Sequence, residues 1–142
     1  MPSIYHPLPQ GAIRLLTLHP REAGGLIYCS FSIHSNYDDT SMPSYFALSY
    51  VWGPKSPTFH ILINGERSAI RENLYNFLLQ SAPCDGLWID ALCINQQDNP
   101  ERSHQVQLMG SIYRQAQMVW AWLGAAEDSG LRKAPIDLRD NQ

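Results

Sequence analysis

The sequence predicts an α/β protein in which helices flank a mixed, largely parallel β-sheet. The apolar run 87–92 follows the turn pair Asp85-Gly86 and is typical of a strand buried on both faces. From residue 60 onward, strand and helix patterns alternate, which favours βαβ units with right-handed crossovers. Asn64-Gly65 lies between two apolar runs and predicts a β-hairpin, so antiparallel strands join the parallel ones.

The totals indicate one globular domain. The chain has 142 residues, of which 44% are hydrophobic, and its net charge is −3. The absence of a basic run argues against nucleic-acid binding, and no apolar run is long enough to span a membrane. No signal peptide is visible. Three cysteines (Cys29, Cys84 and Cys93) fit reduced thiols in a cytoplasmic protein, and the lack of metal-ligand spacings predicts no metal site. No bound cofactor is expected.

The first half predicts three strands. Residues 1–12 are proline-rich and are expected to be loose. A strand is expected at 13–18 and is stopped by His19-Pro20. The alternation over 26–33 predicts a second strand with one apolar face, made of Ile27, Cys29, Phe31 and Ile33. The apolar run 45–52 ends at Gly53-Pro54 and predicts a buried third strand.

The middle of the chain predicts the hairpin and the first helix. Strands at 60–63 and 68–70 flank the Asn-Gly turn. The following helix is expected at 72–81, with an apolar face of Leu74, Phe77 and Leu78, and Pro83 marks its end.

The last third predicts a long helix and a final strand. Asn99 is the expected N-cap and Pro100 the first helical residue. The core-facing stripe is predicted to be Val106, Met109, Tyr113 and Ala116. Residues 118–123 form the expected last strand, and residues 125–142 show no pattern.

A candidate site lies where the central strand ends. Ligands of open α/β sheets bind beyond the carboxyl ends of the strands, and Asp90, Asn95 and Gln96 lead into that region. The neighbouring strand ends with the other candidate contacts, Ser49, Tyr50, Trp52 and Gly53. Asp90 either acts on a ligand or hydrogen-bonds the nearby backbone, since a carboxylate in an apolar strand needs partners.

Arg102 is the candidate cation of this site. It lies in the first turn of a helix, where the dipole disfavours positive charge, so an ion pair with Asp90 or an anionic ligand should compensate. The helix start at Asn99 could also attract a phosphate.

Three motif blocks, in this order, resemble the heterokaryon-incompatibility (HET) domain of filamentous fungi. The first is Tyr45-x-Ala-Leu-Ser-Tyr-Val-Trp-Gly53, and the second is Leu87-Trp-Ile-Asp-Ala-Leu-Cys-Ile-Asn-Gln96. The third runs from Glu101-Arg102 to Trp122-Leu123-Gly124. The resemblance covers residues 13–124 and leaves 125–142 as a tail, which is expected to be truncated.

The resemblance implies a module of fungal non-self recognition that triggers cell death through self-association or a sensor partner. The family is also considered remotely similar to TIR domains, which implies a flavodoxin-like core. Because some TIR domains hydrolyse NAD with a Glu placed after the last strand, an NAD-hydrolysing alternative would use Asp90 and Glu127. A third alternative is an inactive, truncated remnant.

Overall fold

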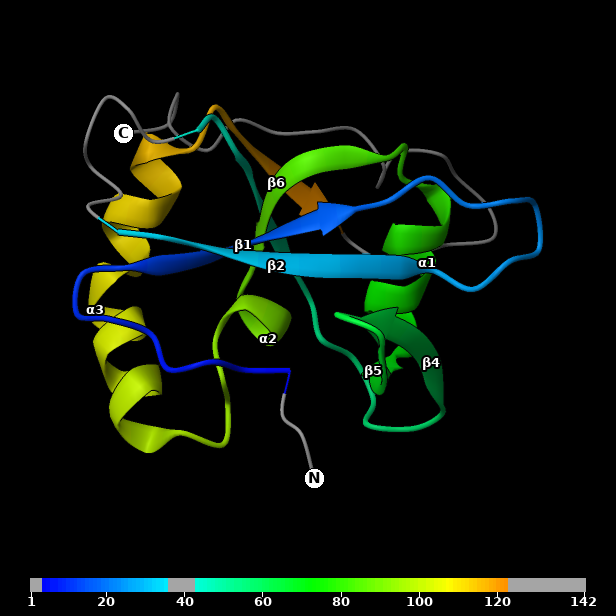
Figure 1. The fold of residues 1–142 in the computed structure, drawn as a ribbon, viewed down its shortest axis with the longest axis horizontal. Coiled ribbons are helices and arrows are strands. Elements are labelled where there is room, and N and C mark those ends of the chain that lie inside the picture. Colours follow the sequence, from blue (N-terminus) through cyan, green and yellow to red (C-terminus); the bar gives the residue numbers. More distant parts are fainter. Residues whose placement is uncertain (1–3, 36–42, 123–142) are drawn as a thin grey trace.

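The computed structural model describes residues 4–35 and 43–122, which form one mixed sheet with three helices (Figure 1). The strands are β1 Ile13–Leu18, β2 Tyr28–His34, β3 Phe46–Tyr50, β4 Thr58–Ile63, β5 Glu66–Arg71, β6 Cys84–Ile89 and β7 Met118–Trp122. The helices are α1 Glu72–Gln80, α2 Asp90–Cys93 and α3 Asn99–Gln115. None of these helices is long and apolar enough to cross a membrane.

The strand order is β5-β4-β2-β1-β6-β3-β7, which confirms the predicted mixed sheet and α/β class. Strand β3 pairs in parallel with both β6 and β7, and β2 pairs in parallel with β4. The pairs β1–β2, β1–β6 and β4–β5 are antiparallel. Parallel and antiparallel pairs are therefore equally frequent in the described part of the sheet, so its description as largely parallel is too strong.

The Asn-Gly hairpin is confirmed. Strands β4 and β5 pair from Thr58↔Arg71 to Ile63↔Glu66. Asn64 and Gly65 both have positive φ, at 53° and 81°. Two consecutive left-handed residues suit a type I′ turn, whose twist matches that of the flanking strands.

The central strand ends earlier than predicted. Strand β6 stops at Ile89, and residues 90–93 form the short helix α2, so a continuous strand over 87–92 is wrong. An apolar run does not by itself distinguish a buried strand from a buried helical turn. The strand also begins earlier and includes Gly86, whose φ is +84°. A side chain at Gly86 would meet the Ser44 carbonyl oxygen at 2.8 Å, so only glycine fits there.

Helix α3 differs from its prediction at its cap and on its buried face. Asp98, not Asn99, is the N-cap, and its Oδ1 accepts a hydrogen bond of 3.1 Å from the Glu101 N–H. Val106 is 54% exposed, whereas Gln105 and Ile112 are buried. The amide of Gln105 is accommodated because its Nε2 donates to the Ala12 carbonyl oxygen at 2.9 Å. The buried position predicted for Val106 is therefore occupied by a polar residue, Gln105.

Several strand ends also shift. Strand β3 stops at Tyr50, which leaves Val51 61% exposed instead of buried within the predicted strand. Strand β2 begins at Tyr28, and Ile33 is 39% exposed, so the predicted apolar face of that strand is only partly buried. Strand β1 and helix α1 match their predictions, and the three predicted core residues of α1 are buried.

Helices α1 and α3 lie on opposite faces of the sheet (Figure 1). Successive residues of a strand point to opposite faces. Trp88 of β6 contacts Tyr113 of α3, with ring centroids 5.6 Å apart. Its neighbour Leu87 lines a cavity together with Phe77 of α1. The core therefore lies on both sides of the central strands, and Trp88 is its largest fully buried side chain.

Candidate functional site

Two parallel strands bring the predicted site residues to one edge of the sheet. Strands β3 and β6 are neighbours, with Ala47 opposite Trp88 and Leu48 opposite Ile89. Both strands end within two residues of this pair. The segment after Tyr50 and the start of α2 at Asp90 therefore leave the sheet side by side. The topology therefore produces a crevice at the carboxyl ends of these strands, as such sheets commonly do.

Asp90 points to the β3 end of this crevice. The Trp52 Nε1–H donates to Asp90 Oδ1 at 3.4 Å, and the Gln96 amide donates to the Asp90 carbonyl oxygen at 2.9 Å. Burial raises the pKa of the Asp90 carboxyl, while the hydrogen bonds from Trp52 and the Ala91 N–H act in the opposite direction. Asp90 therefore takes the backbone-bonding role that the sequence offered and also meets Trp52, while its action on a ligand stays a prediction.

The crevice contains a cavity of about 130 Å³. Its polar lining is made of the last residue of β3, the segment after β3, the last residue of β5 and the segment after α2: Tyr50, Trp52, Arg71 and Gln96. Burial, followed by the charge of Asp90, raises the pKa of the Tyr50 hydroxyl, so it stays protonated and can donate a hydrogen bond. The cavity offers a planar indole, a cation, an amide and a phenol in a small space.

Arg71, which the sequence analysis missed, is the cation at this crevice. Its guanidinium lies 5.1 Å from the centre of the Trp52 ring, and it donates to the Gly53 carbonyl oxygen at 3.0 Å. Gly53 has a φ of +77°, and a Cβ there would lie 2.7 Å from the Asn73 side-chain nitrogen. Arg71 is the last residue of β5 and directly precedes α1. No sequence motif indicates that this end of the hairpin lies beside the crevice.

Three predicted site residues do not join this group. Arg102 is exposed and makes no ion pair with Asp90 in the described part of the chain, so that predicted pair is wrong. Asn95 uses its side-chain oxygen to accept from the Gln97 N–H at 3.1 Å. Ser49 is half-buried within β3, opposite Ala121 of β7, and does not line the cavity. Glu127 lies outside the described residues.

A buried ion pair, which the sequence did not predict, holds the connection that carries Gln96 in place. Arg14 is 1% exposed and binds both carboxylate oxygens of Glu101, at 2.7 and 2.8 Å. It also donates to the carbonyl oxygens of Cys93 and His6. Glu101 in turn accepts from the Asn95 N–H at 2.6 Å. This network ties β1 to both ends of the connection between α2 and α3, which carries Gln96.

The same network holds part of the predicted loose N-terminal segment. Residues 4–12 form no helix or strand, yet the Tyr5 hydroxyl donates to the Leu92 carbonyl oxygen at 2.7 Å. The Tyr5 ring also lies 4.9 Å from the Arg14 guanidinium carbon. This segment therefore covers one side of the Arg14–Glu101 pair.

Cys93 does not provide a nucleophile. It is fully buried, and burial raises the pKa of its thiol to about 12. The described residues contain no group of three or more His, Cys, Asp or Glu side chains that could hold a metal ion.

The sequence model of the family described as heterokaryon incompatibility protein (HET) matches residues 45–141. The chain belongs to the HET family. Within this HET domain the matched region contains Tyr50, Trp52, Arg71, Asp90 and Gln96, so every polar group of the crevice belongs to the family unit.

One curated relative is heterokaryon incompatibility protein 6, OR allele, of Neurospora crassa. It is 37% identical to the HET domain described here, over 87% of this chain and 20% of that protein. The chain therefore spans about a fifth of the length of the relative it matches. No solved structure shows significant similarity to the chain.

Proposed function

We propose that this HET domain is an effector module of fungal non-self recognition. In this proposal it triggers a cell-death response in the cytoplasm, after it associates with itself or with a sensor partner. The observation that carries the proposal is the family match over residues 45–141, supported by the relative whose name states heterokaryon incompatibility.

The size of the crevice favours a role in protein association over catalysis. Pockets that enclose small ligands typically measure roughly 300–1,000 Å³, and the cavity beside Asp90 measures about 130 Å³. Among the described residues it has room for one planar or charged group. A protein segment that inserts a single side chain fits this space better.

The test is inducible expression of the chain in a filamentous fungus, with viability as the readout. We expect growth arrest and cell death after induction. The control is Trp88→Asp, which places a charge at a fully buried core position and should abolish both folding and death. Normal growth despite accumulation of folded protein would refute the proposal and favour an inactive remnant.

A second candidate is a TIR-like hydrolase of nucleotides, with NAD as the favoured substrate. The observation in its favour is a carboxyl with a raised pKa, Asp90, beside the Trp52 indole and the Arg71 cation. In this proposal Asp90 would hold or transfer a proton, and Arg71 would bind phosphate in place of Arg102. Glu127 would supply the second carboxylate of the TIR-like arrangement.

This candidate is tested by incubating the purified chain with NAD and measuring released nicotinamide. We expect release from the native chain and loss of release in Asp90→Asn, which keeps the size of the side chain. An Arg102→Ala control should retain activity, because that side chain is exposed and lies away from the crevice. Absence of nicotinamide in the native reaction would exclude this candidate.

A further inference from the structure

The β4–β5 hairpin has one buried face and one outer face (Figure 1). Successive residues of a strand point to opposite faces. Ile61, Ile63 and Ile70 are buried, so they mark the inner face. The residues that alternate with them are exposed or half-buried and form the outer face. They are Thr58, His60 and Leu62 in β4 and Arg67, Ala69 and Arg71 in β5.

Two arginines make the outer face of the hairpin positive. The exposed Arg67 donates from Nη2 to His60 Nδ1 at 3.2 Å, which confirms that both side chains lie on this face. The half-buried Arg71 uses one nitrogen to bind the Gly53 carbonyl oxygen. In the described part of the chain, neither arginine forms an ion pair. The surface formed by His60, Arg67 and Arg71, called here the basic face, therefore offers two guanidinium groups to a carboxylate partner.

The spacing of the two arginines matches an extended peptide. Arg67 and Arg71 are four residues apart on one face of β5, which corresponds to about 13 Å along the strand. A peptide in the extended conformation also repeats its side-chain direction every second residue. Two acidic residues four positions apart would therefore reach both arginines at once, whereas a spacing of three would turn one carboxylate away.

The basic face leads into the polar crevice at its Arg71 end. The cavity of about 130 Å³ is lined by Ala69 and Arg71 as well as by Trp52 and Tyr50. The Tyr50 hydroxyl, which burial keeps protonated, can donate to a carboxylate beside Arg71. Asp90 lies next to Trp52 but does not line the cavity, and its Oδ1 already accepts from the indole. The cavity thus has room and hydrogen-bond donors for one acidic side chain.

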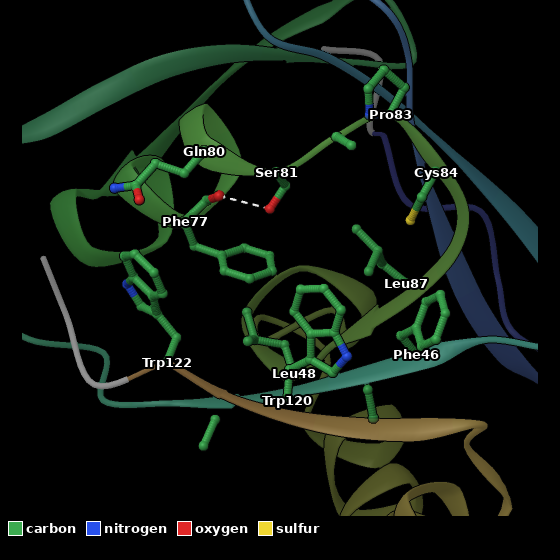
Figure 2. A pocket seen from close by; sticks show the side chains of 13 residues that line it. Phe46, Leu48, Phe77, Gln80, Ser81, Pro83, Cys84, Leu87, Trp120 and Trp122 are labelled. Atoms are coloured by element: carbon green, nitrogen blue, oxygen red, sulfur yellow. Dashed lines mark hydrogen bonds between the residues drawn. The ribbon is translucent and has the colours of Figure 1, made fainter. Parts of the chain in front are cut away.

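The aromatic groove on the α1 side of the sheet offers no comparable charge (Figure 2). Its volume is about 250 Å³, and its wall includes Phe46, Phe77, Trp120 and Trp122. None of the 13 residues that line it is charged. A partner that is selected by its charge would therefore bind the basic face and not the groove.

We infer that the basic face binds an extended, acidic segment of a partner protein, with two carboxylate side chains on Arg67 and Arg71. This inference rests on the partner association in the proposed function and names the chemistry of the partner. The whole chain carries a net charge of −3, so it repels a long polyanion such as a nucleic acid. A short segment with two carboxylates meets mainly the local positive charge of the hairpin.

The experiment is an NMR titration of the full chain with two capped seven-residue peptides of identical composition. Both consist of threonine, valine and two glutamates. The first peptide has glutamates at its second and sixth positions, and the control peptide has them at its second and fifth. The reporters are the backbone amides of Arg67, Ala69 and Arg71 and the indole N–H of Trp52. The indole of the fully buried Trp88 is the internal reference.

We expect the first peptide to shift the reporter signals and to bind at least tenfold more tightly than the control peptide. Arg67→Glu should raise its dissociation constant at least tenfold. The matched variant Arg102→Glu makes the same change of charge at an exposed residue of α3 and should leave binding unchanged. Circular dichroism confirms that both variants are folded. The comparison of the two peptides on the native chain needs no variant.

Three results would overturn the inference: no binding of the first peptide, equal binding of both peptides, or unchanged binding in Arg67→Glu. Tighter binding of a trinucleotide, which carries two phosphate charges, would also overturn it and assign the basic face to a nucleic acid. The expression test remains separate. A chain that causes cell death but binds neither peptide loses this inference and keeps the proposed function. A chain that binds the first peptide without causing death keeps the basic face and loses the proposed function.

Discussion

The polar crevice and the aromatic groove both involve strands β3 and β6, but they differ in the charged side chains around them. Behind the crevice, buried Arg14 has four oxygen partners, from Glu101, Cys93 and His6. The groove is lined without a single charged side chain. A buried charge demands partners in defined positions, so the crevice has a fixed geometry. Apolar packing has no such directional demand, so the groove can accept a second surface. The predictions below test this contrast.

The largest expected effect comes from the buried ion pair. Arg14→Met leaves the Glu101 carboxylate, which is 8% exposed, without its cation. We expect the free energy of unfolding to fall by about 3–5 kcal/mol, the cost of stranding one member of a buried pair. Urea denaturation measures this loss. Arg67→Met is the control, because Arg67 is exposed and should change stability by less than about 0.5 kcal/mol.

A double variant tests whether the cost comes from the stranded charge. Arg14→Met combined with Glu101→Met removes both charges and fills their volume, so it should recover much of the lost stability. If the single variant loses less than about 1 kcal/mol, the network contributes little, and the rigid character assigned to the crevice is wrong.

The second comparison sets two tryptophans against each other. Trp88 is fully buried and packs edge-on against Tyr113, so Trp88→Ala should cost about 3–5 kcal/mol. Trp120 is half-buried at the groove, so Trp120→Ala should cost about 1–2 kcal/mol in the monomer. Urea denaturation measures both values. Equal losses would mean that the groove wall belongs to the closed core.

The sequence predicted the parts of the fold that have a strong local signal. The hairpin at Asn64-Gly65 and the apolar face of α1 were confirmed, because turn chemistry and helical periodicity are local properties. The end of β6 was misplaced because apolar residues continue into α2. Met109, Tyr113 and Ala116 of the predicted α3 stripe do pack at the core, and only Val106 was misplaced. Gln105 is buried in its stead through a hydrogen bond to Ala12, far away in the sequence.

Strand topology made the location of the candidate site predictable, but the sequence did not predict which side chains contact each other there. Asp90, Trp52, Tyr50 and Gln96 meet because the ends of parallel neighbours coincide. Arg102 was predicted as the cation because it lies in the first turn of a helix, where the dipole calls for a compensating negative charge. The cation found at the crevice, Arg71, ends the second strand of the hairpin. The catalytic and binding roles of these residues remain predictions.

A smaller effect is expected for Arg71→Lys. The charge is retained, but the flat guanidinium above Trp52 and its hydrogen bond to Gly53 are lost. Stability should fall by about 0.5–1 kcal/mol, the usual range for an accessible cation–π contact. Thermal denaturation measures the loss, and Arg102→Lys serves as an exposed control. Equal stability of the two variants would mean that the contact between Arg71 and Trp52 does not stabilise the crevice.

The smallest effect is a pH dependence at Asp90. Burial raises the pKa of this carboxyl in the folded chain above its unfolded value, so ionisation destabilises the fold. The stabilising contribution is complete below the unfolded pKa, about 4, and is lost as pH rises through the folded pKa. In Asp90→Asn the side chain does not ionise, and its amide oxygen can still accept from Trp52 Nε1. The difference in unfolding free energy between Asp90→Asn and the native chain should therefore grow in favour of the variant as pH rises from about 4, and then level off. Urea denaturation across this pH range measures the difference. A difference that shrinks with pH would mean that the hydrogen bonds from Trp52 and Ala91 outweigh burial, and Asp90 would then be an ordinary ionised carboxylate instead of a proton-holding group at the crevice.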